Sequence, residues 1–231
     1  MNYIIVVAGG RGERAKLGYN KIFAKLSKLP VVYWTLSVFE KSKIVDKVLI
    51  SAARSDISRI KQLVKKYGFK KVSEIIPASE SRQSSTLDVL ESIKEKIGVR
   101  DLVGVHNGVN PFVTEAEVAE VFKSAKKYGA ALLAQVARDT VKITNGDGLV
   151  KETPMRQNSW YAQTPQVATF ENLYKAHLKA KRDGFVGTDD AQLLERIGVA
   201  PKIVPTTNQN FKITYKEDLV MAKFILKTWA E

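Results

Sequence analysis

The sequence predicts an α/β fold, with a mainly parallel twisted sheet and helices on both faces of that sheet. Two observations lead to this prediction. Continuous runs of Val, Ile and Leu of strand length recur along the first two thirds of the chain, as expected for strands buried on both faces. Each run is followed by a segment in which apolar residues recur at helical spacing, and such alternation is typical of parallel sheets with crossover helices.

The predicted elements alternate along the chain. The first strand, 3–8, is an unbroken uncharged run, and the helical pattern of 30–40 comes next. Further strands are predicted at 47–52, 71–76, 102–106, 131–136 and 202–205, in short segments rich in apolar residues. Further helices are predicted at 56–66, 84–97, 115–128, 170–182, 189–197 and 216–229, where the apolar spacing is helical.

The segment after residue 136 breaks this rhythm. Two short alternating stretches, 141–144 and 149–152, are joined by Asn145-Gly146-Asp147-Gly148. Asn-Gly and Asp-Gly pairs are strong signals for a β-hairpin turn. We therefore predict a β-arm at about 138–160 that projects from a single domain formed by residues 1–231.

The composition narrows the class of protein. Hydrophobic residues make up 45% of the chain, and no apolar run reaches the roughly 20 residues that a membrane span needs. The first strand begins at the N-terminus without the features of an export signal. With no cysteine, the chain can form no disulfide, thiolate zinc site or cysteine nucleophile. We expect a cytoplasmic protein with no membrane partner.

The charge balance favours anionic ligands. The formal net charge is +13, from 37 Lys and Arg against 24 Asp and Glu, and a positive potential concentrates anions near the surface. Much of the excess is lysine at helical spacing, which is typical of solvated helix faces. No helix-turn-helix, zinc or RNA-recognition signature accompanies the charge, so we expect small anionic substrates and no nucleic-acid partner.

A glycine-rich loop after the first strand carries the strongest functional signal. Gly9, Gly10 and Gly12 can bring backbone N–H groups against phosphate, and two cations, Arg14 and Lys21, stand just beyond them. In phosphoryl and nucleotidyl transfer, negative charge develops on non-bridging oxygens, and fixed cations lower that barrier. This combination predicts a nucleoside triphosphate site.

Other interpretations of this loop fit the sequence less well. Residues 10–15 match the dinucleotide pattern G-x-G-x-x-A, but a dehydrogenase needs an acidic residue near the end of the second strand, and none stands there. A Walker loop needs Gly-Lys-Ser or Gly-Lys-Thr after the glycines, which is absent. A tight strand-to-helix turn without a ligand is the remaining structural alternative.

Seven short segments form a specific ordered set along nearly the whole chain. They are Ala8 to Arg14, Asn20-Lys21, Glu80 to Ser85, Asp139-Thr140-Val141-Lys142, Arg156 with Thr164-Pro165-Gln166, Thr188-Asp189-Asp190 and Asn210 to Thr214. In this order they resemble the cytidylyltransferases that join CTP to 2-C-methyl-D-erythritol 4-phosphate, together with their relatives that act on pentitol phosphates.

The resemblance implies a Rossmann-like nucleotidyltransferase fold and a homodimer held partly by the arms. It also implies a Mg²⁺-dependent reaction for isoprenoid precursors, in which an oxygen of the sugar phosphate attacks the α-phosphorus of CTP and pyrophosphate leaves. No general base is needed, because a phosphate monoester, with a second pKa of about 6, is mostly dianionic at neutral pH. Catalysis would then consist of positioning and charge stabilisation.

The resemblance also implies roles for individual residues. Arg14 and Lys21 would stabilise the triphosphate and the transition state, with Lys212 as a further cation near the reacting phosphates. Arg156 and Thr140 would hold the acceptor phosphate, either within one chain or across the dimer. Arg156 is also implied in catalysis. CTP contacts are implied for Ala8, Gly9, Gly10, Gly12, Ser79, Glu80, Ser85 and Asn107, and acceptor contacts for Asn110, Thr140, Arg156, Asp189 and Lys212. The metal ligands are left unassigned.

The chain departs from the family pattern after the fourth strand. Relatives usually carry His-Asp-Ala-Ala-Arg-Pro or His-Asp-Ala-Val-Arg-Pro, whereas this chain has His106-Asn107-Gly108-Val109-Asn110-Pro111. Asn107 adds no charge, and Asn110 cannot form the bidentate phosphate contact of an arginine. Losing a charged hydrogen bond typically costs about 1.5 to 3 kcal/mol. Transfer to another polyol phosphate, such as ribitol 5-phosphate, and a non-catalytic nucleotide-binding protein are therefore the alternatives.

Several of these residues also have a structural interpretation. Asp189 and Asp190 open a helical segment, where acidic residues serve as N-caps. His106 ends a strand and is as readily a core histidine as a functional group. Lys212 alternates with apolar neighbours, as on the outward face of a strand.

Overall fold

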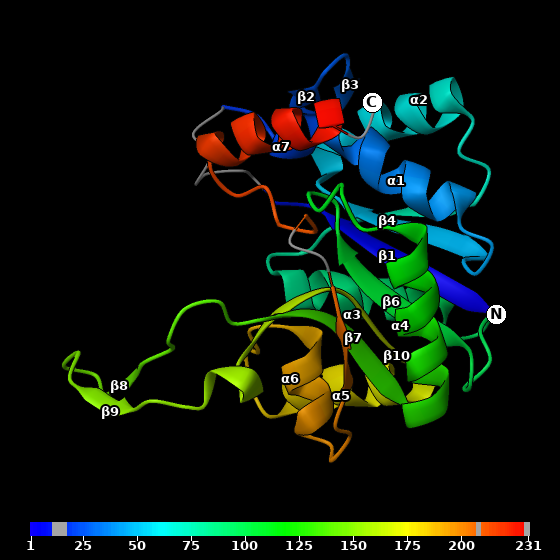
Figure 1. The fold of residues 1–231 in the computed structure, drawn as a ribbon. Helices are drawn as coiled ribbons and strands as arrows, with labels where there is room; N and C mark the ends of the chain where they lie inside the picture. Colours follow the sequence, from blue (N-terminus) through cyan, green and yellow to red (C-terminus); the bar gives the residue numbers. More distant parts are fainter. Residues whose placement is uncertain (11–17, 207–208, 229–231) are drawn as a thin grey trace.

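A seven-stranded mixed sheet forms the centre of the computed structural model, which describes residues 1–10, 18–206 and 209–228 (Figure 1). The strands lie in the order β11-β7-β10-β6-β1-β4-β5. They are β1 (Asn2–Ala8), β4 (Lys47–Ala52), β5 (Val72–Pro77), β6 (Leu102–Asn107), β7 (Ala130–Val136), β10 (Trp160–Thr169) and β11 (Lys202–Pro205). Pairing is parallel throughout except at β10, which runs antiparallel to β6 and β7. The predicted mainly parallel sheet is confirmed.

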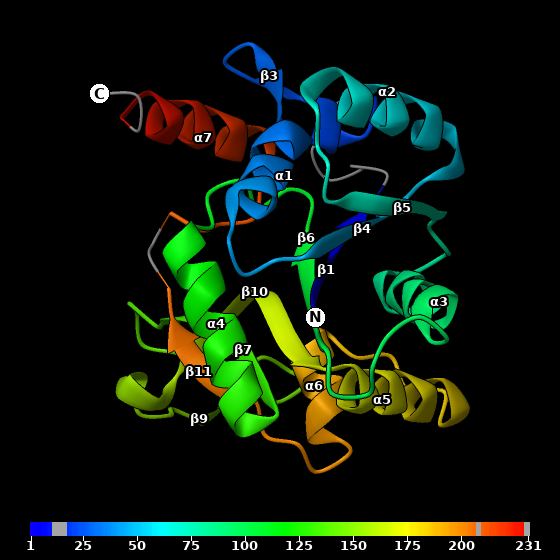
Figure 2. The same cartoon turned by 90° about the vertical axis from the view of Figure 1, so that its right-hand side faces the viewer.

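Helices cover both faces of the sheet, as predicted (Figure 2). One face packs against α1 (Val31–Lys41), α2 (Ile57–Tyr67), α4 (Glu115–Tyr128) and α7 (Lys216–Thr228). The other face packs against α3 (Arg82–Ile93), α5 (Phe170–Arg182) and α6 (Asp190–Glu195). Alternate residues of β1 divide between these two cores, with Ile4 and Val6 in the first and Ile5 in the second.

Local sequence explains where α4 begins and ends. The Thr114 side chain accepts a hydrogen bond from the backbone N–H of Glu117, and the Glu117 side chain accepts one from the backbone N–H of Thr114. This reciprocal capping box satisfies N–H groups that a helix start leaves without partners. Gly129 ends the helix in the left-handed region, at φ +85°, which glycine adopts readily.

The sequence pattern did not predict β10 or the short elements that follow β1. Within β10 stand Gln163, Thr164, Pro165 and Gln166, and both proline and consecutive polar residues are uncommon inside a central strand. The pairing register of β10 with β7 shifts between Ala162 and Gln166, which places this polar segment where the ladder is irregular. The other elements not predicted are η2 (Lys21–Phe23), β2 (Lys25–Leu26), β3 (Leu29–Pro30), η3 (Arg54–Asp56) and η4 (Arg156–Asn158).

The predicted hairpin of the arm is present and projects away from the sheet (Figure 1). Its strands are β8 (Ile143–Thr144) and β9 (Val150–Glu152), which pair antiparallel. The Asn145 side chain accepts hydrogen bonds from the backbone N–H groups of Asp147 and Leu149 and so closes the turn. Within the described ranges, no helix is both long enough and apolar enough to cross a membrane.

Parallel pairing brings several loops to one edge of the sheet. Val7 in β1 lies opposite Asn107 in β6, and Ala8 lies opposite Ala52 in β4. The loops that leave β1, β4, β5 and β6 therefore start side by side. Because β10 is antiparallel, its polar beginning reaches the same edge, with Gln166 opposite Val105. In open α/β sheets, ligands bind outside this edge, at the carboxyl ends of the parallel strands.

Candidate active site

A cavity of about 320 Å³ lies where β6 ends and β10 begins. It is lined by Arg82, Asn107, Asn110, Tyr161, Ala162, Gln163, Thr164, Gln166, Thr188, Asp189, Asn210, Phe211 and Lys212. Two of these side chains are cationic and one is acidic. Four residues predicted from the sequence meet in this wall: Asn107, Asn110, Asp189 and Lys212.

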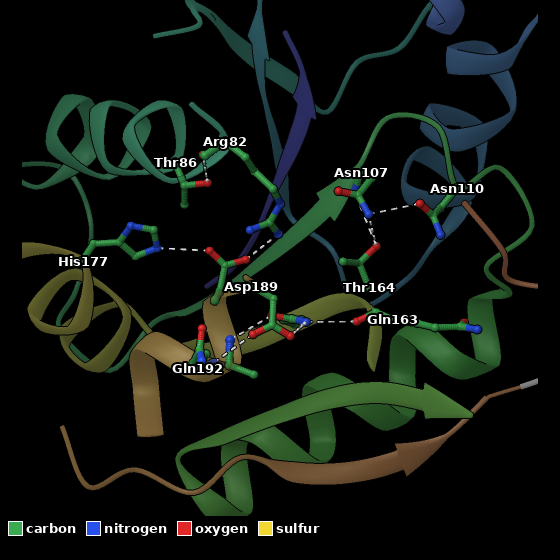
Figure 3. Close-up of polar contacts among 12 residues, drawn as sticks. Arg82, Thr86, Asn107, Asn110, Gln163, Thr164, His177, Asp189 and Gln192 are labelled. Atoms are coloured by element: carbon green, nitrogen blue, oxygen red, sulfur yellow. Dashed lines mark hydrogen bonds and ion pairs between the residues drawn. The ribbon is translucent and has the colours of Figure 1, made fainter. Parts of the chain in front are cut away.

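Asn107 and Asn110 belong to a chain of amide hydrogen bonds in the cavity wall (Figure 3). Asn107 Nδ2 donates to Asn110 Oδ1 at 3.1 Å and to Thr164 Oγ1 at 3.3 Å. Asn210 Nδ2 donates to the carbonyl oxygen of Thr164 at 2.9 Å, and Asn110 Nδ2 donates to the carbonyl oxygen of Asn210 at 3.5 Å. These bonds fasten the segment that carries Lys212 to the end of β6 and the start of β10.

Lys21 reaches this same segment from the first residue of η2. Asn20 caps η2, and its Nδ2 donates to the carbonyl oxygen of Ala8 at 2.9 Å, which ties η2 to the end of β1. The Lys21 side chain is buried, and its Nζ lies 3.5 Å from the carbonyl oxygen of Thr214. Lys212, two residues earlier, is exposed and lines the cavity. The structure therefore brings two predicted cations to neighbouring segments.

Arg82 stands in the cavity wall with a buried ion pair behind it (Figure 3). Its Nη2 lies 2.5 Å from Asp190 Oδ2, and Asp190 Oδ1 lies 3.1 Å from His177 Nε2. Burial alone would raise the pKa of Asp190, but the charge of Arg82 and the hydrogen bond with His177 outweigh burial and hold that pKa well below its usual range. Asp190 is therefore a carboxylate at neutral pH.

Asp189 is the N-cap of α6, as its structural interpretation predicts. Its Oδ1 accepts from the backbone N–H of Gln192 at 2.9 Å, and its Oδ2 accepts from Gln166 Nε2 at 2.8 Å. Gln166 in turn accepts from the backbone N–H of Ala191 at 2.9 Å. Asp189 lines the cavity with both carboxylate oxygens already bonded, and its contact with an acceptor stays a prediction.

Two loops with predicted CTP contacts pack against each other outside the cavity lining. Ala8 is buried at the end of β1, and Gly10 is exposed. A Cβ on Gly9 would lie 2.3 Å from the Cβ of Ala78, so this close approach of the two loops requires glycine. The predicted residues Gly12 and Arg14 lie outside the described residues.

The loop after β5 carries the other predicted CTP residues. Ser79 and Glu80 are exposed, and the backbone N–H of Ser79 donates to Ser85 Oγ at 3.0 Å. Ser85 is buried, and its hydroxyl donates to the carbonyl oxygen of Ser81 at 2.7 Å. Ser85 thus shapes the loop that presents the exposed residues, and the predicted CTP contacts of all three stay predictions.

The predicted residues of the arm lie apart from the cavity lining. Thr140 and Arg156 are both exposed, and Arg156 begins η4. The Nη1 of Arg156 lies 3.4 Å from the carbonyl oxygen of Arg138, which holds the guanidinium along the root of the arm. Contact of these two residues with an acceptor phosphate, in one chain or across a dimer, stays a prediction.

His106 is a core histidine in this structure. It is fully buried, its Nε2 lies 3.0 Å from the carbonyl oxygen of Asn110, and its ring meets that of Phe39 edge-on at 5.0 Å. Burial, offset only in part by hydrogen bonds to the backbone, lowers its pKa to about 4. The imidazole is therefore neutral at neutral pH, and it does not line the cavity.

The acidic side chains near the cavity are already bonded to other side chains of the protein. Among residues 1–10, 18–206 and 209–228, no three His, Asp or Glu side chains gather into a group that could hold a metal ion. The carboxylate of Asp189 is bonded to Gln166, and that of Asp190 to Arg82.

Other residues that line the cavity had no predicted role, among them Arg82, Thr164, Gln166 and Asn210. Each of these four stands within a segment that resembles the family, so a sequence signal was available for them. His177 had no such signal, because it lies in the middle of α5 and meets the buried carboxylate only through packing of α5 against α6.

The fold and the position of the cavity define an α/β nucleotidyltransferase, and solved structures share this architecture. The structure is similar to 4-diphosphocytidyl-2C-methyl-D-erythritol synthase from Anaerococcus prevotii, with a TM-score of 0.85, 28% identity, and 98% of this chain and 96% of that chain covered. It is also similar to 2-C-methyl-D-erythritol 4-phosphate cytidylyltransferase from Francisella tularensis, with a TM-score of 0.80, 28% identity and coverage of 96% and 98%.

Sequence comparison gives the family. The profile of the 2-C-methyl-D-erythritol 4-phosphate cytidylyltransferases matches residues 2–228. The enzyme of that name from Geobacter metallireducens is 37% identical over 226 residues, which are 97% of each chain. The one from Geobacillus kaustophilus is 37% identical over 227 residues, 98% of this chain and 97% of that one. The chain belongs to the 2-C-methyl-D-erythritol 4-phosphate cytidylyltransferase family, which confirms the resemblance seen in the sequence.

Proposed function

We propose that the protein transfers CMP from CTP to 2-C-methyl-D-erythritol 4-phosphate and releases pyrophosphate, a step in the synthesis of isoprenoid precursors. The observation that carries this proposal is the family match over residues 2–228. The cavity at the carboxyl ends of the parallel strands supports it, because Asn107, Asn110 and Lys212 meet there. The protein is accordingly a nucleotidyltransferase enzyme.

The reaction needs charge stabilisation more than proton transfer. An oxygen of the acceptor phosphate forms a bond to the α-phosphorus of CTP, and the bond to the bridging oxygen breaks, so pyrophosphate leaves. Lys21 and Lys212 stand on neighbouring segments, where they can offset the charge that develops on the phosphate oxygens. The acceptor is already dianionic at neutral pH, so no side chain needs to remove a proton.

Transfer to another polyol phosphate, such as ribitol 5-phosphate, is the second candidate. Asn107 and Asn110 stand where relatives usually carry an aspartate and an arginine, and both line the cavity. Their amides bond to each other and to Thr164, so they offer an acceptor phosphate no charged contact at these positions. This difference concerns the acceptor and leaves the CTP half of the reaction unchanged.

We also propose that the reaction requires Mg²⁺. Mg²⁺ in such enzymes keeps several waters and is held by one or two carboxylates together with substrate phosphates. The described residues form no group of three acidic or histidine ligands, so the triphosphate of CTP is the proposed main source of ligands.

A homodimer held partly by the arms and a cytoplasmic location complete the proposal. The arm exposes several large apolar side chains, with Leu149 68%, Val150 60% and Met155 63% exposed, and such surfaces favour association. With no cysteine, the chain lacks the disulfides that are common in exported proteins. Sedimentation velocity with and without residues 143–152 tests the dimer, since loss of the hairpin is expected to give monomers.

Pyrophosphate release from CTP and Mg²⁺ tests the function directly. The acceptor panel contains the phosphates of 2-C-methylerythritol, ribitol, erythritol and glycerol. The highest kcat/KM with the methylerythritol phosphate supports the proposal, and preference for ribitol 5-phosphate supports the second candidate. CTP binding without release for any acceptor indicates a non-catalytic protein. The variant Lys21→Met keeps the aliphatic part of the side chain without its charge and serves as the control for the site. Chelation with EDTA, followed by added Mg²⁺, tests the metal requirement.

A further inference from the structure

We propose that His177 and Asp190 are positioning residues that hold Arg82 so that its remaining N–H donors bind a phosphate oxygen in the cavity. The inference rests on the proposed function for the identity of the substrates. It concerns three side chains that come from α3, α5 and α6 and meet only in the folded protein.

The exposure of Arg82 points to a ligand. Its side chain is 26% exposed and lines the cavity, while only its Nη2 is engaged by Asp190. A guanidinium has five N–H donors in a planar fork, so donors are left for a second partner. Bidentate binding of phosphate oxygens is what this geometry favours. Arg82 lines the cavity with the carboxylate of Asp190 behind it.

The support behind Arg82 is fully buried. Asp190 is 0% exposed and His177 is 1% exposed. Each oxygen of the carboxylate has one partner, Arg82 on Oδ2 and His177 on Oδ1. Figure 3 shows Arg82 and His177 extending toward each other from their helices. A carboxylate held on both sides fixes the direction of the guanidinium, and an arginine that is already fixed loses little conformational freedom when it binds a ligand.

Backbone contacts fix the same arrangement from outside. Gln83, next to Arg82, donates through Nε2 to the carbonyl oxygen of Phe185 at 2.9 Å. Its Oε1 accepts from the backbone N–H of Gly187, also at 2.9 Å. These two bonds clamp the first turn of α3 to the loop that leads into α6. The distance between Arg82 and Asp190 is therefore set by the scaffold as well as by their charges.

A second arginine–aspartate pair provides a matched control. Arg196 Nη2 lies 3.1 Å from Asp183 Oδ2, and both side chains are partly exposed. This pair does not line the cavity. Replacement of Arg196 therefore removes an arginine–aspartate pair that lies outside the cavity, and Asp183 keeps Lys179 as a partner.

Binding of inorganic pyrophosphate, measured by calorimetry, tests the contact without requiring turnover. Arg82→Gln is expected to weaken binding about 10- to 100-fold, because it removes charged hydrogen bonds. Arg196→Gln is expected to change affinity less than about twofold. Unchanged affinity of Arg82→Gln for pyrophosphate, and for the polyol phosphate titrated in the same way, overturns the proposal. Because both titrations measure binding alone, they give an answer even if the acceptor panel shows no turnover.

A double-mutant cycle tests the positioning role. His177→Phe removes the hydrogen bond to Asp190 and is expected to weaken pyrophosphate binding about 3- to 10-fold when Arg82 is present, and not at all in Arg82→Gln. His177→Gln is expected to restore affinity, because its amide nitrogen stands at the same place along the side chain as Nε2. Equal losses in both backgrounds overturn the positioning role. If His177→Phe does not fold, Asp190→Asn replaces it in the same cycle.

Steady-state kinetics identify which phosphate Arg82 binds. A higher KM for CTP in Arg82→Gln assigns the contact to the nucleotide, and a higher KM for the polyol phosphate assigns it to the acceptor. A wild-type kcat/KM for both substrates overturns the proposal.

Discussion

Replacement of His106 by glutamine should flatten the acid side of the stability profile. Burial lowers the pKa of this histidine from 6.5 to about 4 in the folded protein. Between these two values the unfolded chain binds a proton that the folded chain does not. The stabilisation is therefore fully present above about pH 6.5 and is lost as the pH falls toward 4.

The size of the effect follows from the same two values. One proton bound only by the unfolded chain changes the free energy of unfolding by about 1.4 kcal/mol per pH unit. From pH 6.5 down to about 4, the loss approaches roughly 3 kcal/mol. Asp190 also has a lowered pKa, but a carboxylate loses its contribution only below its ordinary range near 4. The two contributions therefore fall in different pH windows.

Urea unfolding at pH 4.5, 5.5, 6.5 and 7.5 measures this difference. His106→Gln keeps an N–H donor at the position of Nε2, which contacts the carbonyl oxygen of Asn110. The wild-type protein should lose stability over this range more steeply than the variant, by about 1 kcal/mol per pH unit below 6. Equal slopes in the two proteins would refute the assignment of a neutral buried imidazole.

Three other substitutions test the site, the sheet and a helix start. Lys21→Met should lower kcat/KM for pyrophosphate release about 100-fold or more with little change in the unfolding curve, and a near-normal rate would exclude its proposed role. Gly104→Val should lower the free energy of unfolding, measured in urea, by about 1 to 3 kcal/mol, because even a Cβ at this position would lie 2.5 Å from Ile4 Cδ1. Gly146→Ala is the control, because Gly146 lies in open space on the arm and no change in stability is expected. Thr114→Ala removes the capping box of α4 and should lower the free energy of unfolding by about 1 kcal/mol. An unchanged free energy of unfolding would contradict this prediction.

Most of the sheet was predictable because its parallel strands are apolar on both faces. β1, β4 and β6 are almost entirely buried, and their runs rich in Val, Ile and Leu carry that information in the sequence. β10 was not predictable in this way. Gln163, Thr164 and Gln166 stand within it and line the cavity. These polar side chains break the apolar pattern by which a strand is predicted from sequence. Segments that form a functional site often depart from the pattern of their element in this way.

The same contrast holds within the site. Asn107 and Asn110 were predicted near the reaction because their segment resembles one in the family, and the structure places both in the cavity lining at the carboxyl end of β6. The ion pair of Arg82 with Asp190 joins residues 108 positions apart. The second partner of Asp190, His177, lies inside α5. No periodicity or spacing encodes that contact. It depends on how α3, α5 and α6 pack on one face of the sheet, which only the folded chain determines.

Under the proposed function, the cavity has to bind phosphate without an arginine at position 110. Asn110 is 2% exposed and bonded to neighbouring amides, so it forms an uncharged part of the cavity wall. Lys212 and Arg82 still line the cavity. Two carboxylates stand near these cations: Asp190 is buried and bonded to Arg82, and Asp189 lines the cavity while bonded to Gln166 and to the start of α6. With asparagine at position 110, we expect phosphate recognition to depend on the remaining donors of Arg82 and on Lys212.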